Sequence, residues 1–182
     1  MAKKKARSKS KPAKRKAVKA KSKAKPRAKA RKVAHVPKGY HSVTPYLMVK
    51  GAAEAIEFYK RAFGAKEKLR MPEGGRISHA ELVVDGSHIM LADEYPERGL
   101  IAPQPGSRSP VGIMLYLKDV DAVATRAVDA GATLERPVED QFYGDRLGAI
   151  VDPFGHRWYI ATHVEDVSEK EMQRRMQAMQ PQ

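Results

Sequence analysis

The most constraining feature of this 182-residue sequence is an internal repeat. A predicted strand, a helix that ends at Gly-Ala and three more strands occur at about residues 42–94 and again at about 110–166. One such copy is too small to bury a face of its own sheet. We therefore predict an α+β fold in which two βαβββ modules form a half-open mixed sheet or barrel, with helices outside and a concave pocket inside.

Apolar periodicity and Gly-containing turns set the bounds of these elements. Pro45 lacks an N–H group, so we expect the first strand to lie at a sheet edge or to turn that position outward. Residues 95–110 are rich in Pro, Gly and Ser and are interpreted as a linker. Strands are predicted at 43–49, 66–71, 76–84 and 88–93, then at 111–117, 133–137, 145–151 and 157–162, with helices at 51–63 and 120–130.

The charge is divided unevenly along the chain. Residues 1–40 contain 18 of the 35 Lys and Arg residues and no Asp or Glu, which leaves 17 basic against 21 acidic residues in the remainder. Residues 1–38 have almost no apolar side chains to bury, so we expect a disordered Lys/Ala-rich tail. Its composition resembles histone-like tails, and residues 1–34 are expected to contact nucleic acid without sequence preference. A solubilising extension or a misassigned start is the alternative.

Composition excludes several classes of protein. The sequence has no Cys, which rules out disulfide scaffolds, Cys-ligated zinc, iron–sulfur clusters and thiol nucleophiles. Neither a membrane-spanning run nor the apolar region of a secretory signal is expected from its hydropathy. We therefore expect a cytoplasmic protein, or one associated with the nucleoid through its tail.

Five segments share the pattern of a known family. The most specific reads Asp-Pro-Phe-Gly-His-Arg-Trp at 152–158 and continues as Thr-His-Val-Glu-Asp at 162–166. Across about 42–166 the chain resembles the vicinal oxygen chelate superfamily of glyoxalases, bleomycin-resistance proteins and dioxygenases, and within it the PhnB-like branch. The resemblance implies the fold predicted above, for a domain of residues 39–166. The other matching segments are 43–47, 55–65, 89–94 and 143–146.

The resemblance also implies a divalent metal held by four His, Gln or Glu side chains. Aligned strand by strand, these positions fall on Thr44, Met90, Gly112 (or its neighbour Ile113) and Tyr159. None of these is an ordinary His or carboxylate ligand. We therefore expect no metal and no other cofactor, and without its Lewis acid the glyoxalase reaction is rejected.

His79 and Glu81 are the candidate catalytic residues. Two positions apart on a strand, they share one face, and the alternating Ala80, Leu82 and Val84 share the other. A simple hydrogen-bonded pair is the favoured interpretation, because the sequence places no second His with them. His88 and His156 lie at turns and are interpreted as solvated.

The same alternation predicts the wall of the concave pocket. Tyrosines and methionines with few polar groups suit a planar or aliphatic molecule, which Tyr46 and Tyr116 are expected to grip from two sides. A cavity that is collapsed or closed by a partner subunit, or a structural ion pair between Asp145 and Arg146, is the alternative. Trp158 is expected in the core. The predicted ligand-binding residues are Thr44, Tyr46, His79, Glu81, Met90, Met114, Tyr116, Tyr143, Asp145, Arg146 and Tyr159.

Residues 167–182 are predicted to form an amphipathic helix. Ser168 and Glu171 have the spacing of a capping box, and Met172, Met176 and Met179 form an apolar stripe. We expect this stripe to pack on the outer face of its own sheet or on a second copy. A homodimer is what the family resemblance implies.

Three functions are consistent with these features. The first is sequestration of a small organic ligand, as in bleomycin-resistance proteins. The second is a glyoxalase- or dioxygenase-like lyase or oxygenase with a relocated site near His79 and Glu81. The third is a nucleoid-associated protein that binds DNA non-specifically through its tail.

Overall fold

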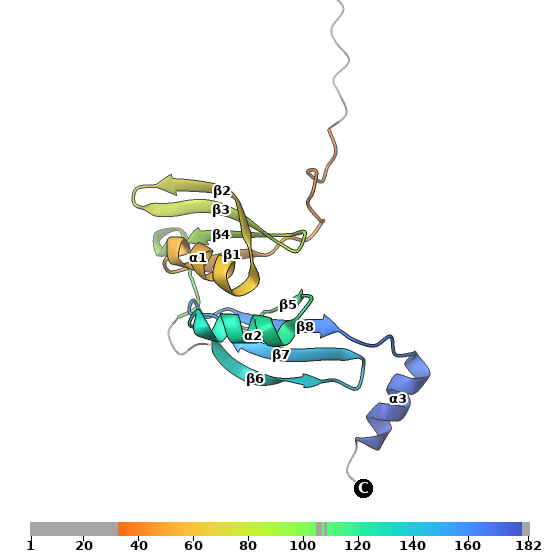
Figure 1. Ribbon diagram of the computed structural model, residues 1–182. Helices are drawn as coiled ribbons and strands as arrows, with labels where there is room; N and C mark the ends of the chain where they lie inside the picture. Colours follow the sequence, from red (N-terminus) through yellow and green to blue (C-terminus); the bar gives the residue numbers. More distant parts are fainter. Residues whose placement is uncertain (1–32, 105–106, 108, 180–182) are drawn as a thin grey trace, which may run out of the picture. The chain divides into compact units, whose positions relative to one another are not determined.

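The computed structural model describes residues 33–104, 107 and 109–179. The chain divides into two units, Met1–Ala34 and His35–Gln182, and every described helix and strand belongs to the second (Figure 1). The predicted disorder and nucleic-acid contacts of the tail fall almost entirely on residues 1–32, outside the described residues.

The first module is a four-stranded sheet with one helix. Strand β1 pairs in parallel with β4, while β4 with β3 and β3 with β2 are antiparallel, giving the order β1-β4-β3-β2. A short 3-10 turn, η1 (Pro96–Arg98), follows the module. Its elements are β1 (Tyr46–Val49), α1 (Ala52–Phe63), β2 (Lys66–Glu73), β3 (Arg76–Val84) and β4 (Ser87–Asp93).

The second module repeats this topology with the order β5-β8-β7-β6. Its one parallel pair is β5 with β8, the counterpart of β1 with β4. A final helix, α3 (Glu169–Ala178), follows it. The elements of the module are β5 (Gly112–Tyr116), α2 (Val120–Asp129), β6 (Thr133–Asp140), β7 (Asp145–Val151) and β8 (Arg157–His163).

The predicted fold class is confirmed: two βαβββ modules form two mixed four-stranded sheets, which do not close into a barrel within the described part of the chain. Both proline-containing edge strands run further than predicted, β2 through Pro72 and β6 through Pro137. An edge strand tolerates a missing N–H group, so these prolines do not end it. The first strand, by contrast, begins at Tyr46 rather than Val43, whose side chain is 83% exposed.

Both helices begin where a side chain satisfies their first free N–H groups. Gly51 adopts a left-handed conformation with φ of 94° before α1, and Asp93 at the end of β4 accepts hydrogen bonds from the N–H groups of Gly51 (3.0 Å) and Ala52 (2.8 Å). Asp119 caps α2 by accepting from the N–H of Ala122 at 3.0 Å. The start of α1 is thereby fixed to the end of β4, and the start of α2 to the turn that follows β5.

An aromatic cluster joins the two modules. Helices α1 and α2 contact each other and lie on the same side of the two sheets (Figure 1). Trp158 of β8 is fully buried, as predicted, and its ring lies 4.9 Å from that of Phe63 and 5.4 Å from that of Tyr59. The helix-facing sides of the two sheets therefore share one hydrophobic core, and the helices leave the opposite faces uncovered.

The C-terminal helix confirms one prediction and contradicts another. Ser168 accepts a hydrogen bond from the N–H of Glu171 at 3.3 Å, which is the predicted N-terminal cap. No residue of α3 is buried, however, and Met176 and Met179 are 48% and 69% exposed. The expectation that the methionine stripe packs on its own sheet is wrong: α3 extends away from the sheets (Figure 1), and Arg175 holds it through Glu165 and the carbonyl of Phe142.

None of the described helices is long and apolar enough to cross a membrane.

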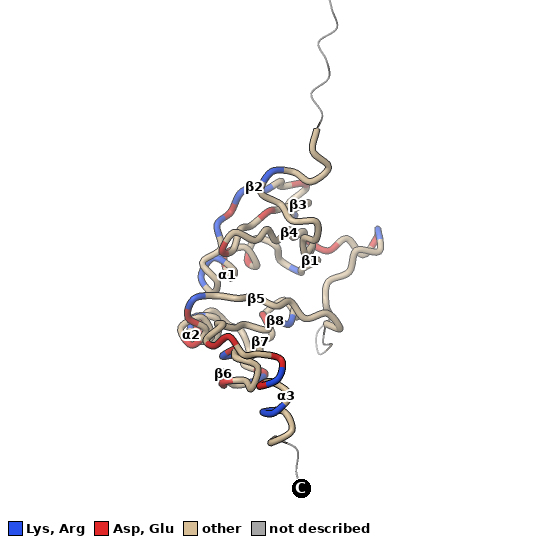
Figure 2. Tube along the Cα trace, turned by 90° about the vertical axis from the view of Figure 1, so that its right-hand side faces the viewer, with Lys and Arg blue, Asp and Glu red and all other residues tan. Residues whose placement is uncertain are grey.

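Acidic and basic residues both occur along each module (Figure 2). The same view shows that residues 94–104 pass on the side of the sheets away from α1 and α2. The segment between the modules thus overhangs the face that the helices leave uncovered.

Candidate functional site

The alternation predicted for the strands is confirmed on the first sheet. Leu47 and Val49 of β1 are buried toward α1, which leaves Tyr46 and Met48 on the other face. On β3 the buried Ala80, Leu82 and Val84 belong to the core, so His79 and Glu81 lie on the face opposite the helices. In the strand register Met90 lies opposite both Tyr46 and Glu81 and shares this face.

A line of four polar side chains crosses this face of the first sheet. The Tyr46 hydroxyl lies 3.1 Å from Nδ1 of His79, and Nε2 of His79 lies 3.2 Å from Oε1 of Glu81. The other carboxylate oxygen of Glu81 accepts a hydrogen bond from the hydroxyl of Tyr40. The ring of Tyr40 stacks on His88, with centroids 3.9 Å apart. The predicted His79–Glu81 pair thus exists, extended by a tyrosine at each end.

The groups in this line influence one another's ionisation. The hydrogen bond from Tyr40 lowers the pKa of Glu81 more than any other contact does, and His79 adds to the effect. The same bond raises the pKa of Tyr40. Burial, followed by the nearby phenol of Tyr95, raises the pKa of Tyr46. At neutral pH Glu81 is therefore a carboxylate and both tyrosines keep their protons.

A related cluster lies on the second sheet. The hydroxyl of Tyr116 donates to Oδ2 of Asp145 at 2.7 Å, and Oδ1 of the same carboxylate lies 2.7 Å from Nδ1 of His163. Asp166 approaches Nε2 of His163 at 3.0 Å. Asp145, followed by Asp166, raises the pKa of His163. In this cluster the buried carboxylate of Asp145 lies between Tyr116 and His163. On the first sheet, by contrast, His79 lies between Tyr46 and Glu81.

One cavity in the described residues is lined by residues of both β1 and β5. We call it the seam cavity; its volume is about 820 Å³, and residues 101–104, 107 and 109–112 form one of its walls. Most of its lining is apolar, and Tyr46 contributes to both this cavity and the polar line on the first sheet. Its apolar lining comes chiefly from Val43, Pro45, Met48, Ile101, Val111, Ile113 and Met114, and its polar lining from Tyr46, Gln104, Ser107, Ser109 and His156.

The two expected tyrosines do not line one cavity. Tyr116, together with Thr44, lines a second hollow of about 430 Å³. This hollow adjoins the seam cavity and shares four lining residues with it: Val43, Pro45, Ile113 and Met114. Tyr46 and Tyr116 are 49% and 51% exposed, so each is accessible from its own hollow. The hydroxyl of Tyr46 forms a hydrogen bond with His79 of the first sheet, and that of Tyr116 with Asp145 of the second. Each ring is therefore held by its own sheet.

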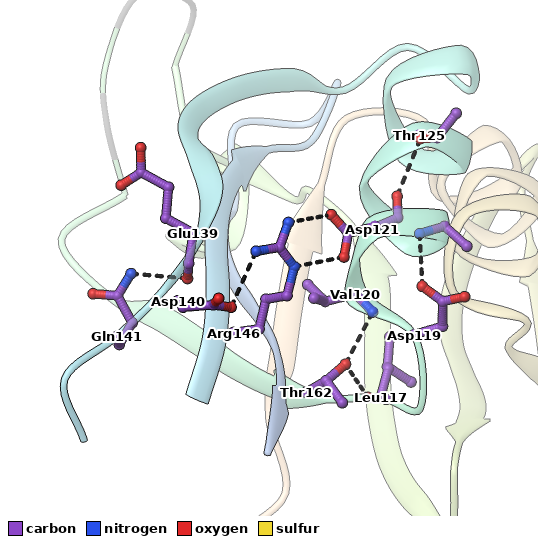
Figure 3. Close-up of polar contacts among 11 residues, drawn as sticks. Leu117, Asp119, Val120, Asp121, Thr125, Glu139, Asp140, Gln141, Arg146 and Thr162 are labelled. Carbon is purple, nitrogen blue, oxygen red and sulfur yellow. Dashed lines mark hydrogen bonds and ion pairs between the residues drawn. The ribbon is translucent and has the colours of Figure 1, made fainter. Parts of the chain in front are cut away.

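Arg146 lies on the wrong side of its sheet for the predicted role. Its guanidinium forms two hydrogen bonds of 2.7 Å with Asp121 of α2 and one of 3.1 Å with Asp140 of β6 (Figure 3). The expectation that it lines the pocket is therefore wrong, and so is the suggested ion pair with Asp145. Adjacent residues of a strand point to opposite faces, so Asp145 and Arg146 cannot share one. Tyr143 packs edge-on against Phe142, with centroids 5.2 Å apart, outside the seam cavity.

The side chains at the family's metal positions do not fit a divalent metal. Thr44 lies outside β1, and Met90 offers only a thioether. The ring of Tyr159 lies against Gly112, in the space that a side chain at that position would need. Among the described residues, no group of three or more His, Asp or Glu side chains is arranged to hold a metal ion.

Several residues of these clusters were not singled out by the sequence. Tyr40 precedes the first strand and gave no periodic signal. His88 and His156 are not simply solvated: His88 stacks on Tyr40, and Nε2 of His156 lies 3.0 Å from the carbonyl oxygen of Met48. His163 belongs to a matched sequence motif, but its contact with Asp145 depends on the pairing of β7 with β8.

Comparisons with known proteins agree with this architecture. A family model described as the Glyoxalase/Bleomycin resistance protein/Dioxygenase superfamily matches residues 33–160. The uncharacterized protein Mb0911c of Mycobacterium bovis is 41% identical over 139 residues, which cover 74% of this chain and 91% of that protein.

Solved structures show the same fold. TioX from Micromonospora sp. ML1 has a TM-score of 0.54 and 27% identity, covering 67% of this chain and 98% of its own. The fosfomycin resistance protein FosX from Listeria monocytogenes, solved with Mn(II) and 1S,2S-dihydroxypropylphosphonic acid, has a TM-score of 0.52 over 74% of this chain and 95% of its own. At 18% identity, its likeness concerns the fold alone.

Proposed function

The chain belongs to the glyoxalase/bleomycin resistance/dioxygenase superfamily, and on that premise we propose that it binds a small, largely apolar organic molecule and sequesters it. The seam cavity is the proposed site. We propose that it acts as the bleomycin-resistance proteins of the superfamily do, and that it belongs to the PhnB-like branch.

The observation that carries this proposal is the size and lining of the seam cavity. Its volume of about 820 Å³ lies within the range of roughly 300–1,000 Å³ that is usual for small-molecule sites. The lining combines apolar walls with a few polar groups, the pattern that holds an organic molecule and fixes its orientation. The ring of Tyr46 offers a stacking surface, and the thioethers of Met48 and Met114 adapt to the shape of a ligand.

Binding is tested by screening aromatic and aliphatic metabolites and antibiotics with a thermal-shift assay, since a ligand of the folded state raises the unfolding temperature. Hits are then titrated by calorimetry. Tyr46→Ala should weaken binding at least about tenfold, because the aromatic contact and its buried area are lost together.

Tyr116→Ala is the matched control. It removes the same side chain from the neighbouring hollow and should leave affinity for the seam cavity nearly unchanged. Equal affinity in the wild type and Tyr46→Ala would place the ligand elsewhere. Weakening by Tyr116→Ala alone would move the site to the second hollow.

An enzyme that uses His79 and Glu81 is the alternative, favoured by the contact between these two residues. Elemental analysis of protein purified without chelators distinguishes the two proposals. About one bound metal per chain, lost in His79→Ala, would support a metalloenzyme with a relocated site over simple sequestration.

The tail supports a second role. Eighteen Lys and Arg residues without a single acidic residue among residues 1–40 favour non-specific contact with nucleic acid through counterion release. This role belongs to residues 1–34 and is independent of the seam cavity.

We also propose that the protein is a homodimer. The exposed Met176 and Met179 of α3 support this, because an apolar helix face that none of the described residues buries is suited to a second copy.

A further inference from the structure

The two strands that line the seam cavity, β1 and β5, are both edge strands. The strand orders are β1-β4-β3-β2 and β5-β8-β7-β6, so each of the two pairs on one side only within the described part of the chain. Figure 1 and Figure 2 both draw β1 and β5 as the edges by which the two sheets face each other. The backbone groups on the open side of each strand are therefore available to a further strand.

Backbone groups of β5 point away from its one pairing strand. In a parallel pair the N–H and C=O groups of one residue point to the neighbouring strand, and those of the next residue point the opposite way. The N–H of Leu117 donates to the carbonyl oxygen of Ala161 in β8 at 2.8 Å, so the residues two and four positions before Leu117 also face β8. None of the described residues bonds to the backbone groups that face away, which belong to Gly112, Met114 and Tyr116.

The edge of β1 is open in the same way, apart from one group. The carbonyl oxygen of Pro45 accepts from the N–H of Met90 in β4 at 2.9 Å. The backbone groups of Tyr46 and Met48 consequently face away from β4. Nε2 of His156 lies 3.0 Å from the carbonyl oxygen of Met48 and occupies that acceptor. The edge of β5 is therefore the longer of the two free edges.

The outer edges of the two sheets differ from these inner edges. β2 and β6 contain Pro72 and Pro137, several charged side chains, and shifts of register against the neighbouring strand. Such features protect an edge strand from pairing with another chain. β1 and β5 read Tyr-Leu-Met-Val and Gly-Ile-Met-Leu-Tyr, without proline, charge or a shift of register. The unprotected edges are thus the ones that line the seam cavity.

We propose that the seam cavity binds an extended, uncharged peptide, which adds to β5 as a further strand. This inference rests on the proposed function of the cavity and specifies the class of molecule that it holds. In strand addition, backbone hydrogen bonds supply affinity and pockets beside the edge hold alternate side chains. Since β5 has five residues and a strand rises roughly 3.4 Å per residue, the edge spans about 17 Å and matches a segment of about five residues.

The lining of the cavity favours an uncharged segment. None of the described residues that line it is Asp, Glu, Lys or Arg, so a charged peptide side chain would lose water there without gaining an opposite charge. Gly112 and Met114 line the seam cavity, and Tyr116 lines the adjoining hollow. The edge of β5 therefore runs through both hollows, and a bound strand would lie along both.

The probe is the peptide Gly-Thr-Val-Thr-Val-Thr-Gly, acetylated and amidated at its ends. It carries no charge, and its residues favour an extended strand. The control peptide has the same side chains with its Thr and Val nitrogens methylated, so these nitrogens cannot donate hydrogen bonds. Calorimetry with full-length protein should show binding of the first peptide and at least about tenfold weaker binding of the second, because several hydrogen bonds are lost.

Substitutions in β5 test the edge itself. Met114→Pro removes the N–H that faces the peptide and keeps the bonds to β8, since an edge strand tolerates proline where its N–H is unpaired. Met114→Leu has a similar side-chain size and keeps the N–H. Met114→Pro should bind the peptide about fivefold more weakly than Met114→Leu, the effect of one ordinary hydrogen bond. Met48→Pro and Met48→Leu, on the edge of β1, should bind it equally. Circular dichroism checks that each variant is folded.

The outcomes separate this inference from the proposed function. Equal affinity for the two peptides refutes strand addition, and this test stands even if Met114→Pro does not fold. Equal affinity of folded Met114→Pro and Met114→Leu, or weakening confined to Met48→Pro, refutes pairing with β5. If the peptide does not bind and small molecules still bind in a manner that depends on Tyr46, the peptide is refuted and the proposed function stands. If neither binds, both are refuted.

Discussion

Asp145 and Asp152 are the buried charged residues of the described chain, and they lie in different surroundings. Asp145 is shared between Tyr116 and His163 on the face opposite the helices. Asp152 lies in the core, where its two oxygens accept hydrogen bonds from four donors. These are the Tyr59 hydroxyl (2.7 Å), Nε1 of Trp158 (2.9 Å) and the N–H groups of Phe154 (3.0 Å) and His156 (2.9 Å).

Replacing Asp152 should therefore damage the fold. In Asp152→Asn the new NH₂ group faces at least one buried donor, which is left without a partner, and such a loss costs about 1–3 kcal/mol. We expect the free energy of unfolding in urea to fall by about 2 kcal/mol or more. Asp140→Asn, at an exposed position paired with Arg146, is the control and should change stability by less than about 1 kcal/mol. Similar stabilities for the two variants would show that the network around Asp152 adds little.

His163 should make stability depend on pH. Its folded-state pKa is raised above the ordinary 6.5, chiefly by Asp145. Protonated His163 thus stabilises the folded state fully below the unfolded pKa, and this contribution is lost as pH rises through the folded value. The difference in unfolding temperature between the wild type and His163→Gln should be larger at pH about 5.5 than at pH about 9. A difference that is constant with pH, or larger at high pH, would contradict the assignment.

At the scale of single elements, α3 differs from α1 and α2. Those two helices bury seven and four residues, whereas α3 buries none. Exposed ion pairs such as that between Arg175 and Glu165 hold it near the end of β8, and pairs of this kind contribute little to stability. Within the described part of the chain, α3 therefore lacks the buried apolar face that stabilises α1 and α2.

Replacing Met172, Met176 and Met179 together with Gln tests the dimer at this element. Each buried methionine is worth roughly 1.5–3 kcal/mol, so the triple variant should sediment as a monomer under conditions where the wild type is a dimer. Far-ultraviolet circular dichroism checks that the sheets are retained, since no core residue is changed. A monomeric wild type, or a variant that remains dimeric, would show that α3 is not the contact.

At the scale of the whole molecule, the chain combines a basic segment with a mildly acidic domain. The described domain has its own core, with both modules contributing to it. Ion pairs join some of the charged side chains on its surface, as the Arg146 cluster illustrates (Figure 3). The unbalanced positive charge of the protein therefore resides in residues 1–40.

Deleting residues 1–34 should separate the two roles. The thermal midpoint should change by no more than about 2 °C, because no apolar packing is removed. Retardation of DNA on a gel at low salt should disappear, since counterion release by the Lys and Arg residues drives it. A truncated domain that still retards DNA would show that the acidic domain itself binds.

The fold was largely predictable because strand alternation and helical periodicity specify each element locally, and the same order of elements occurs in both modules. Alternation placed Leu47 and Val49 toward α1 and His79 and Glu81 away from it, and both observations hold in the structure. The bounds of β2 and β6 were predicted less well, because both strands continue past the predicted ends and contain a proline, which a strand tolerates only at certain places in a sheet. That place is a property of the sheet and not of the segment.

The sequence by itself therefore determined the repeat, the class of fold, the face of each strand and the division of charge, because these follow from side-chain spacing. Only the tertiary structure decided which of the outward-facing groups meet. It paired Tyr40 with Glu81 over 41 positions, separated Tyr46 from Tyr116 and turned Arg146 toward α2. Contacts of this kind depend on strand register and on the packing of distant segments, which spacing along the chain does not encode.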